Sequence, residues 1–288
     1  MYSSLEKIIR RADEQNIPFW KAVQKHDCRE EGRTEEESFQ KMKEMYLAMK
    51  ESDFEYDPDL KSSSGLVGGE AYKIHVRRAN GEMIGGEFVS AVMERALRIA
   101  ESNACMKRIV AAPTAGSCGV VPAVLLSIQE RNRLSDDKMT EALFVAGGIG
   151  GVIARRASLS GAEGGCQAEI GSASAMAAGA LTYLLGGSGK QITNAAAIAL
   201  KGLLGLSCDP VAGLVEVPCV KRNVIGSVNA VTSAEMAMAG IESKIPPDQV
   251  IDAMRSIGHM MPCELRETAK GGLAATPAAQ EITQKISM

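Results

Sequence analysis

Residues 161–185, GAEGGCQAEIGSASAMAAGALTYLL, join a glycine-rich turn to a long run dominated by alanine, and this pattern decides the fold class. Alanine is the strongest helix former, whereas strands are enriched in valine, isoleucine and aromatic residues. We therefore expect a helix over residues 168–185. Because its side chains are small, neighbouring helices can approach it closely.

The same succession of glycine clusters and apolar runs continues along the chain. Residues 72–76 are a weak strand candidate, since they precede the hairpin-like dipeptide Asn80-Gly81, but a helix fits them about as well. No segment sustains the period-two alternation of a strand, so we expect an all-α fold, a single large helical domain with glycine-rich loops between its helices. The further predicted helices span residues 87–103, 120–132, 136–158, 190–204, 227–239 and 248–260.

The N-terminal residues 1–52 predict a segment of three helices with polar outer faces. An acidic, proline-containing stretch follows and reads as a connection. We place the main helical domain at residues 60–288 and expect it to be continuous with residues 1–52. The helix signals in the N-terminal segment are Ser3 and Thr34 at the starts of two capping boxes, Pro18 at a helix start and Gly32 at a helix end.

The composition is that of an ordinary globular protein. Hydrophobic residues make up 45% of the 288 residues and charged residues 23%, which is enough for a sizeable core. A net charge of −3 without long runs of like charge argues against general binding to nucleic acids or anionic membranes. Residues 1–11 lack the apolar region of a secretion signal, and the apolar windows are too short to span a bilayer, so we expect a cytoplasmic protein.

Three of the seven cysteines have surroundings that suit a metal centre. Cys166 follows a glycine turn and precedes a predicted helix, whose N-terminal amides favour a thiolate. Cys208 and Cys219 bracket a stretch in which Pro210 and Pro218 prevent a continuous helix. The spacing alone is weak, because no C-x-x-C pattern is present. We expect the other cysteines to be ordinary buried or half-buried residues: Cys28, Cys105, Cys118 and Cys263.

Two loops suit the binding of a carboxylate, because each offers hydroxyl and backbone N–H groups ahead of a predicted helix. The alternative is that they are only helix caps and tight turns. Neither a phosphate-binding G-x-x-x-x-G-K-[ST] loop nor a dinucleotide-binding G-x-G-x-x-G after a strand occurs. The first loop consists of Lys61, Ser62, Ser63, Ser64 and Gly65, and the second of Thr114, Ala115, Gly116 and Ser117.

The chain offers no convincing general base. It contains three histidines, His26, His75 and His259, and the surroundings of each predict a surface or capping residue. Proton abstraction needs a base within about 3 Å of the proton that it removes. The catalytic base is therefore unassigned from the sequence.

The cysteine segments and the two loops lie in motifs that closely resemble the alpha chain of the bacterial iron–sulfur L-serine dehydratases. The motifs occur in the same order as in that family, and the resemblance covers nearly the whole chain, most strongly residues 61–275. They occupy residues 64–69, 112–117, 161–173, 208–210, 216–219 and 267–274.

The resemblance implies a lyase that converts L-serine to pyruvate and ammonia and whose catalytic domain carries a [4Fe–4S] cluster. The positions that match the cluster ligands are Cys166, Cys208 and Cys219. Three ligands leave one iron open to act as a Lewis acid on the serine hydroxyl. The two loops would then bind the substrate carboxylate, and a monovalent cation is a possible additional cofactor.

The resemblance also implies a protein partner. Two-chain members of the family pair this subunit with a beta chain, in a heterodimer or a higher oligomer, and the resemblance implies that chain as a source of the missing base. Single-chain relatives carry a cysteine close to the C-terminus that can occupy the open iron, whereas residues 276–288 contain none. Either solvent takes that position at rest, or a partner covers it.

Three alternatives to this function stay open, and a fourth is disfavoured. The chain could be an iron–sulfur lyase for threonine or cysteine, because small side-chain differences change binding modestly. It could be a non-catalytic iron–sulfur sensor or electron carrier, or a helical binding module without a metal. A pyridoxal phosphate enzyme is disfavoured, because the α/β pattern with a Schiff-base lysine is absent.

Overall fold

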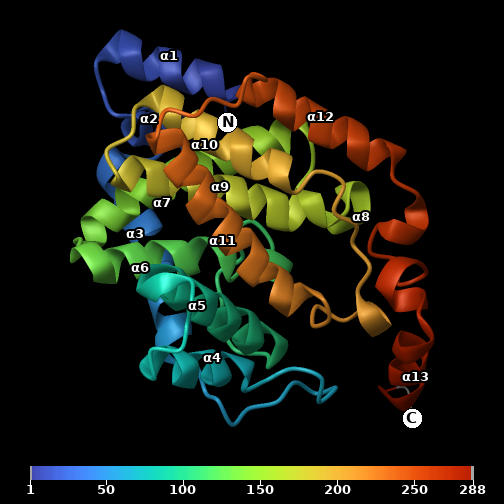
Figure 1. Ribbon diagram of the computed structural model, residues 1–288. Helices are drawn as coiled ribbons and strands as arrows, with labels where there is room; N and C mark the ends of the chain where they lie inside the picture. The colour runs from blue at the N-terminus through green and yellow to red at the C-terminus, as the bar shows by residue number, and fades with distance from the viewer. Residues whose placement is uncertain (1, 287–288) are drawn as a thin grey trace.

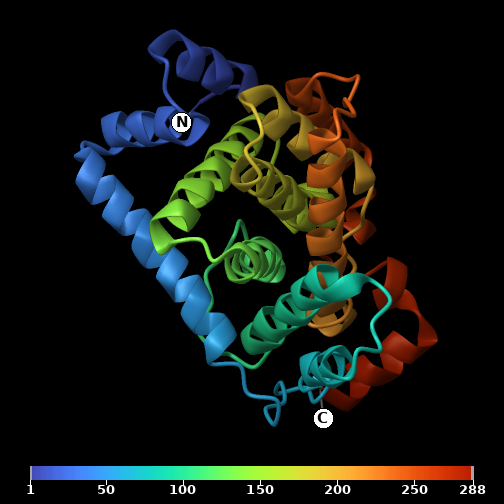
Figure 2. The ribbon, with the colours of Figure 1, turned by 60° about the vertical axis from the view of Figure 1, so that its left-hand side comes forward.

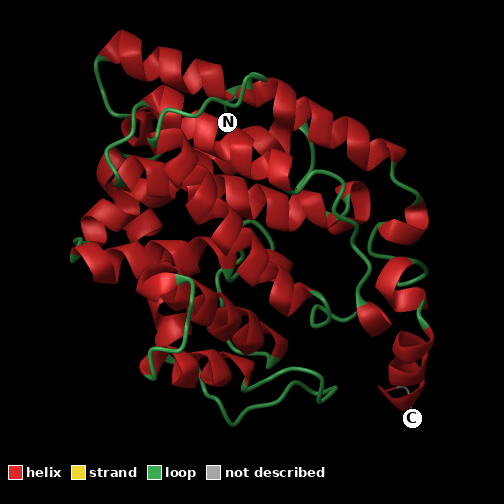
Figure 3. Ribbon diagram, viewed as in Figure 1, coloured by secondary structure: helices red, strands yellow, loops and turns green. Residues whose placement is uncertain are grey.

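The computed structural model describes residues 2–286, which form helices and short helical turns but no strand (Figure 3). The predicted all-α class is confirmed. The α-helices are α1 Leu5–Gln15, α2 Phe19–Glu31, α3 Glu35–Phe54, α4 Glu70–Ala79, α5 Gly86–Ala104, α6 Val120–Asn132, α7 Asp136–Arg156, α8 Gly161–Gly164, α9 Ser172–Leu184, α10 Gly189–Gly202, α11 Cys219–Met238, α12 Pro247–Met260 and α13 Pro277–Ile286.

Short helical turns occupy several of the predicted loops. The turns are η1 Ala115–Ser117, η3 Val211–Gly213, η4 Cys263–Leu265 and η5 Gly272–Ala275, together with the π-helical turn η2 Gln167–Gly171. The π turn leads directly into α9, so the helix expected over residues 168–185 is present with a wider first turn. Such π-turns are often found at functional sites.

Helix α9 lies at the centre of the bundle, where it packs against α6, α7, α10 and α11 (Figures 1 and 2). Every residue from Ser172 to Thr182 is buried. Small side chains make this possible, because they allow helix backbones to approach one another on all sides of α9. The alanine-rich composition therefore specifies the middle of the core.

The N-terminal helices belong to the same hydrophobic core. Helices α2 and α3 pack against α7, and Leu5, Phe19 and Tyr46 are buried in the cluster that also contains residues of α9. Figure 2 shows α3 along one side of the molecule and the C-terminal residues on the other. No helix formed by residues 2–286 is long and apolar enough to cross a lipid bilayer.

The N-terminal helix signals are largely confirmed. Thr34 and Glu37 form a reciprocal capping box at the start of α3, and Gly32 ends α2 with a positive φ of 65°. Pro18 precedes the first residue of α2. The capping box predicted at Ser3 is wrong, because Ser4 is the N-cap of α1 and accepts a hydrogen bond from the backbone N–H of Lys7.

Two boundaries in the main domain also differ from the prediction. Residues 72–76 lie inside α4, so the weak strand candidate is helical. Helix α11 begins at Cys219 rather than at residue 227. The cause is Gly226, which does not interrupt the helix: an added Cβ there would lie 2.8 Å from Ile170 Cγ2, so this glycine permits close packing.

Buried Glu101 on α5 fixes the start of α4. Helix α4 has a glycine at its N-cap and no side-chain cap, but Glu101 Oε1 accepts hydrogen bonds from the backbone N–H groups of Glu70, at 2.8 Å, and Ala71, at 3.1 Å. Its second oxygen accepts a bond of 2.7 Å from the Tyr56 hydroxyl. One carboxylate on a distant helix therefore replaces the missing cap and anchors both ends of residues 56–70.

We predict that Glu101→Ala lowers the free energy of unfolding by roughly 2–4 kcal/mol, because three donors lose a largely buried acceptor. Urea unfolding followed by circular dichroism measures the change. The matched control is Glu235→Ala on the exposed face of α11, which should change stability by less than about 0.5 kcal/mol. Equal effects of the two substitutions would show that Glu101 does not cap α4.

Candidate functional site

Cys166, Cys208 and Cys219 lie in three different segments, all at breaks between helices. Cys166 follows Gly165, whose φ is +73°, and immediately precedes the π turn. Cys208 lies on extended backbone after α10, where its N–H donates to the carbonyl of Leu265 at 2.8 Å. Cys219 is the first residue of α11. The three side chains are buried, with exposures of 2%, 3% and 9%.

The three thiols lie close enough to influence one another electrostatically. Burial raises the pKa of Cys166 to about 11 and that of Cys219 to about 12. Burial also raises the pKa of Cys208, and charge on Cys166 and Cys219 raises it further. These buried thiols are therefore protonated near neutral pH unless a cation stabilises their thiolates.

Gln167 ties the Cys166 segment to the segment that precedes Cys208. This fully buried side chain accepts a hydrogen bond of 2.9 Å from the N–H of Gly205 and donates to the carbonyl of Met254 at 3.1 Å. Its own N–H donates to the carbonyl of Leu206 at 3.0 Å. Hydrogen bonds of Gln167 alone thus connect the Cys166 segment to residues 205 and 206 and to α12.

Arg222 is a cation beside these thiols. The sequence did not reveal it as a member of the site. It lies on α11, within hydrogen-bonding range of the Cys166 thiol, whose pKa it lowers against the larger effect of burial. Its guanidinium also donates to Asp209 Oδ1 at 2.8 Å and to the carbonyl of Ser207 at 2.7 Å. Asp209 in turn accepts the N–H of Leu273 at 2.9 Å, which connects this pair to the C-terminal residues.

Two glutamates, Glu169 and Glu267, converge on Cys208. A Cβ added to Gly161 would lie 2.9 Å from Glu169 Oε2, 3.0 Å from Cys208 Sγ and 3.2 Å from Glu267 Oε2. The three polar groups therefore surround a space that exists because residue 161 has no side chain. Burial raises the pKa of Glu169, and the nearby charge of Glu267 raises it further. Such a carboxyl keeps its proton to a higher pH than an exposed glutamate does.

The loop of Thr114, Ala115, Gly116 and Ser117 lies beside Glu169. The Thr114 hydroxyl hydrogen-bonds to this carboxylate, and a Cβ at Gly116 would lie 3.4 Å from Glu169 Oε1. The structure therefore brings this predicted loop to the cysteines. Thr114 and Ser117 also form a reciprocal helix cap in this loop. Such a cap is what the alternative interpretation, a loop that is only a helix cap, predicts.

Buried Asn223 joins this loop to the Cys219 end of α11. Its side-chain amide donates to the carbonyl of Gly116 at 2.8 Å and to that of Cys219 at 2.9 Å. Its carbonyl oxygen accepts the N–H of Gly119 at 2.9 Å. An added Cβ at Gly119 would lie 2.6 Å from the backbone oxygen of Ala96, so glycine is required where α6 meets α5.

The loop of Lys61, Ser62, Ser63, Ser64 and Gly65 contacts a different glutamate. The hydroxyls of Ser62 and Ser64 both donate to Glu216 Oε2, which lies between Cys208 and Cys219 in sequence. Val215, next to Glu216, lies 3.5 Å from the position of a Cβ at Gly116. The serine loop, the Thr114–Ser117 loop and the cysteines thus form one continuous region.

The remaining cysteines differ in exposure. Cys118 is fully buried, and Cys28 and Cys105 are half-buried, as expected. Cys263 is exposed, so the prediction of a buried or half-buried residue is wrong there. It lies in η4, at the start of a surface segment whose following residues reach Cys208 by backbone hydrogen bonds.

Two of the three histidines pair with glutamates, whereas His259 lines a small pocket with Gly164 and Ala168, which flank Cys166. His26 on α2 pairs with Glu30 at 3.5 Å, His75 on α4 hydrogen-bonds to Glu94 at 3.1 Å, and His259 is exposed in the last turn of α12. These positions agree with the surface or capping roles expected from the sequence.

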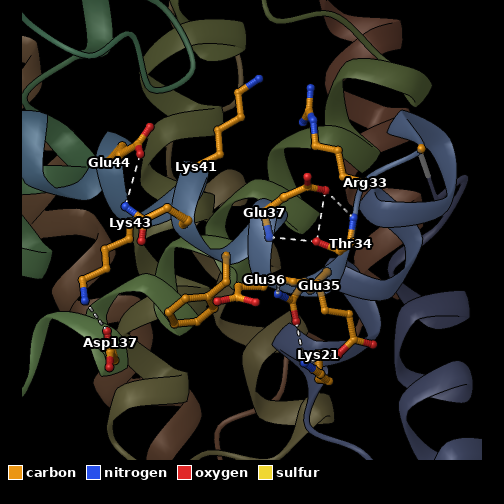
Figure 4. A pocket seen from close by; sticks show the side chains of 14 residues that line it. Lys21, Arg33, Thr34, Glu35, Glu36, Glu37, Lys41, Lys43, Glu44 and Asp137 are labelled. Atoms are coloured by element: carbon orange, nitrogen blue, oxygen red, sulfur yellow. Dashed lines mark hydrogen bonds and ion pairs between the residues drawn. The ribbon is translucent and has the colours of Figure 1, made fainter.

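A groove with a volume of about 1210 Å³ lies elsewhere on the surface, between the α2–α3 turn and Asp137 (Figure 4). Its charged side chains pair locally: Lys21 with Glu35 and Lys43 with Asp137, both at 2.7 Å. None of the predicted site residues lines it, so this groove is separate from the candidate site.

The chemistry of the donor set suits an iron–sulfur cluster, because thiolates are the usual ligands of such clusters and three buried thiols influence one another here. Among residues 2–286, no three histidine, cysteine, aspartate or glutamate side chains are placed to hold a single metal ion.

The sequence reasoning missed Glu169, Glu216 and Glu267 as members of the site, although all three stand inside the motifs that carry the resemblance. Glu169 and Glu216 are carboxylates in runs of small or apolar residues. That contrast is the signal that could have identified these two, because a charged residue in such a run needs a specific partner. Glu267 stands between Arg266 and Thr268, so it carries no such signal.

Comparison with known proteins agrees with the motifs. The family described as "Serine dehydratase alpha chain" matches residues 14–274. The chain is 44% identical to a probable L-serine dehydratase alpha chain of Bacillus subtilis, over 99% of this chain and 95% of that protein. It is 40% identical to the L-serine dehydratase alpha chain of Peptoniphilus asaccharolyticus, over 98% and 97%.

A longer relative, the L-serine dehydratase of Streptomyces coelicolor, is 49% identical over 62% of this chain and 40% of that protein. The match therefore covers part of a larger polypeptide in that organism, whereas the two alpha chains match almost from end to end. This chain belongs to the serine dehydratase alpha chain family.

Proposed function

We propose that this chain is the catalytic subunit of an L-serine dehydratase, a lyase that converts L-serine to pyruvate and ammonia. The observation that carries the proposal is the approach of three buried cysteines from separate segments, next to two loops rich in hydroxyl groups, in a member of this family. Two relatives of similar length are named as alpha chains of this enzyme.

In this proposal Cys166, Cys208 and Cys219 hold a [4Fe–4S] cluster. Thiolates are the usual ligands of such clusters, and the raised pKa values of Cys166 and Cys219 mean that cluster binding releases protons. When bound through three cysteines, the cluster supplies a Lewis acid for the departing hydroxyl. Arg222, beside Cys166, compensates part of the negative charge that three thiolates bring.

The two loops would orient the substrate through its carboxylate. Lys61 supplies a positive charge and Ser63 an exposed hydroxyl on one side, and Thr114 and the η1 turn supply a hydroxyl and backbone groups on the other. Ser62 and Ser64 shape the first loop through their bonds to Glu216. Fixing the carboxylate at one end and the hydroxyl at the other orients the Cα–H bond for removal of its proton.

The proposed partner is a beta chain, as the alpha-chain names of the relatives suggest. His26 and His75 pair with Glu30 and Glu94, and His259 is exposed in the last turn of α12, so we assign the base that removes the α-proton to the partner. Glu169 and Glu267 are then carboxyl groups that give or accept protons at the hydroxyl end of the substrate.

We predict that Cys166→Ser, Cys208→Ser and Cys219→Ser each lose the cluster. Serine is a poor substitute for a thiolate, so iron and acid-labile sulfide should fall sharply after anaerobic purification. Cys105→Ser and Cys263→Ser are the matched controls and should retain both. Full iron content in Cys208→Ser would refute the ligand assignment.

We predict that activity decays in air and returns after anaerobic treatment with ferrous iron, sulfide and a reductant. An iron without a protein ligand is open to oxidation when solvent reaches it. Pyruvate formation is followed over time with and without oxygen. Stable activity in air in the presence of a chelator would contradict a catalytic cluster.

We predict that the isolated chain binds its cluster but forms pyruvate slowly, because loss of a general base typically costs about 10²–10⁴-fold in rate. Addition of a beta chain should restore the rate in a steady-state assay. If the pure isolated chain is instead fully active, the base belongs to this chain, and Glu267→Gln and Glu169→Gln identify which carboxylate supplies it.

A further inference from the structure

Glu216 connects the segment between the cysteines to the serine loop. It lies three residues before Cys219, and its side chain is 7% exposed. Its backbone is fixed on both sides: its N–H donates to the carbonyl of Leu214 at 2.8 Å, and its carbonyl accepts the N–H of Val220 at 3.0 Å. The carboxylate therefore has a defined place relative to the first turn of α11.

The Glu216 carboxylate accepts hydrogen bonds from two hydroxyls of the serine loop. Ser62 Oγ donates to Glu216 Oε2 at 3.0 Å, and Ser64 Oγ donates to the same oxygen. Each hydroxyl also accepts a backbone N–H, from Val67 at 3.3 Å and from Leu66 at 3.1 Å respectively. Because a hydroxyl has one hydrogen to donate, neither Ser62 nor Ser64 has a donor left for a substrate carboxylate in this conformation.

The backbone of the loop is closed by further contacts. The N–H of Ser62 donates to the carbonyl of Val67, and the N–H of Gly65 donates to the carbonyl of Ser62, both at 2.9 Å. Gly68 has a φ of +131°, and a Cβ there would lie 2.2 Å from the carbonyl oxygen of Leu60, so the two ends of the loop touch. The loop is thus a compact turn whose side-chain anchor is Glu216.

We propose that Glu216 is a positioning residue that holds the serine turn in its substrate-binding conformation from the segment between Cys208 and Cys219. Ser62 and Ser64 then serve as the attachment points of the turn, and the groups that meet the substrate are those of Lys61, Ser63 and Gly65. This inference rests on the proposed function for its substrate, but the contact itself is a property of the chain.

A consequence is that the cysteines and the turn are mechanically linked. Cys208 and Cys219 bound the segment that carries Glu216, so fixing both thiols in a cluster restricts the movement of that segment. The turn should therefore exchange its backbone amide hydrogens more slowly in the cluster-loaded chain than in the empty chain.

The test compares Glu216→Ala and Ser64→Ala, which remove the acceptor and one of its two donors, with Glu235→Ala as the control on the exposed face of α11. Hydrogen–deuterium exchange of residues 61–69 is measured with and without the cluster, together with iron content, kcat and KM for L-serine in the presence of the beta chain. Ser64→Ala removes only one oxygen atom, so it provides a folded variant if Glu216→Ala is unstable.

We expect both variants to keep their iron, to exchange faster over residues 61–69 and to raise KM on the order of tenfold with a smaller change in kcat. The double variant should be little worse than Glu216→Ala alone, because Ser64→Ala removes a bond that Glu216→Ala already removes. Unchanged exchange over residues 61–69, or additive effects on KM, would overturn the role of Glu216. If the variants exchange faster but the unaltered chain with its beta chain does not consume serine, the proposed function is overturned. The role of Glu216 in holding the turn then still stands.

Discussion

Close packing around α9 is the constraint on which the rest of the structure depends. This helix is buried on every side, so its residues must be small, and the helices around it are held at the distances that small residues allow. A central helix of this kind leaves little room for polar chemistry inside the bundle. The reactive groups are therefore placed where helices begin and end, at the turn before α9, the segment after α10 and the first residue of α11.

Irregular backbone at these ends needs partners for its hydrogen-bonding groups, and buried polar side chains supply them. Gln167 accepts a hydrogen bond from Gly205, in the segment that leads to Cys208. Asn223 donates to the carbonyls of Gly116 and Cys219, and Glu101 caps α4 from a neighbouring helix. The same kind of contact connects the serine turn to Glu216. Polar side chains from distant parts of the sequence thus hold together the loops that surround the cysteines.

Carboxylates are the unexpected component of this region. Two loops that suit the binding of a carboxylate each already contact one from the chain itself, Glu169 at Thr114 and Glu216 at Ser62 and Ser64. Glu267 adds a third beside Cys208. Like charges repel, so these glutamates disfavour an anion beside them, and the positively charged groups of the region are Lys61 in the serine loop and Arg222 beside Cys166.

The sequence by itself determined the helical class and most helix positions, because helix propensity and glycine or proline breaks act over a few residues. It did not determine that α11 continues through Gly226, that Cys263 is exposed, or that Arg222, Glu169 and Glu267 lie beside the cysteines. These properties depend on contacts between residues far apart in the chain. Only the tertiary structure decides them, since burial and hydrogen-bond partners are set by which helix ends the packing brings together.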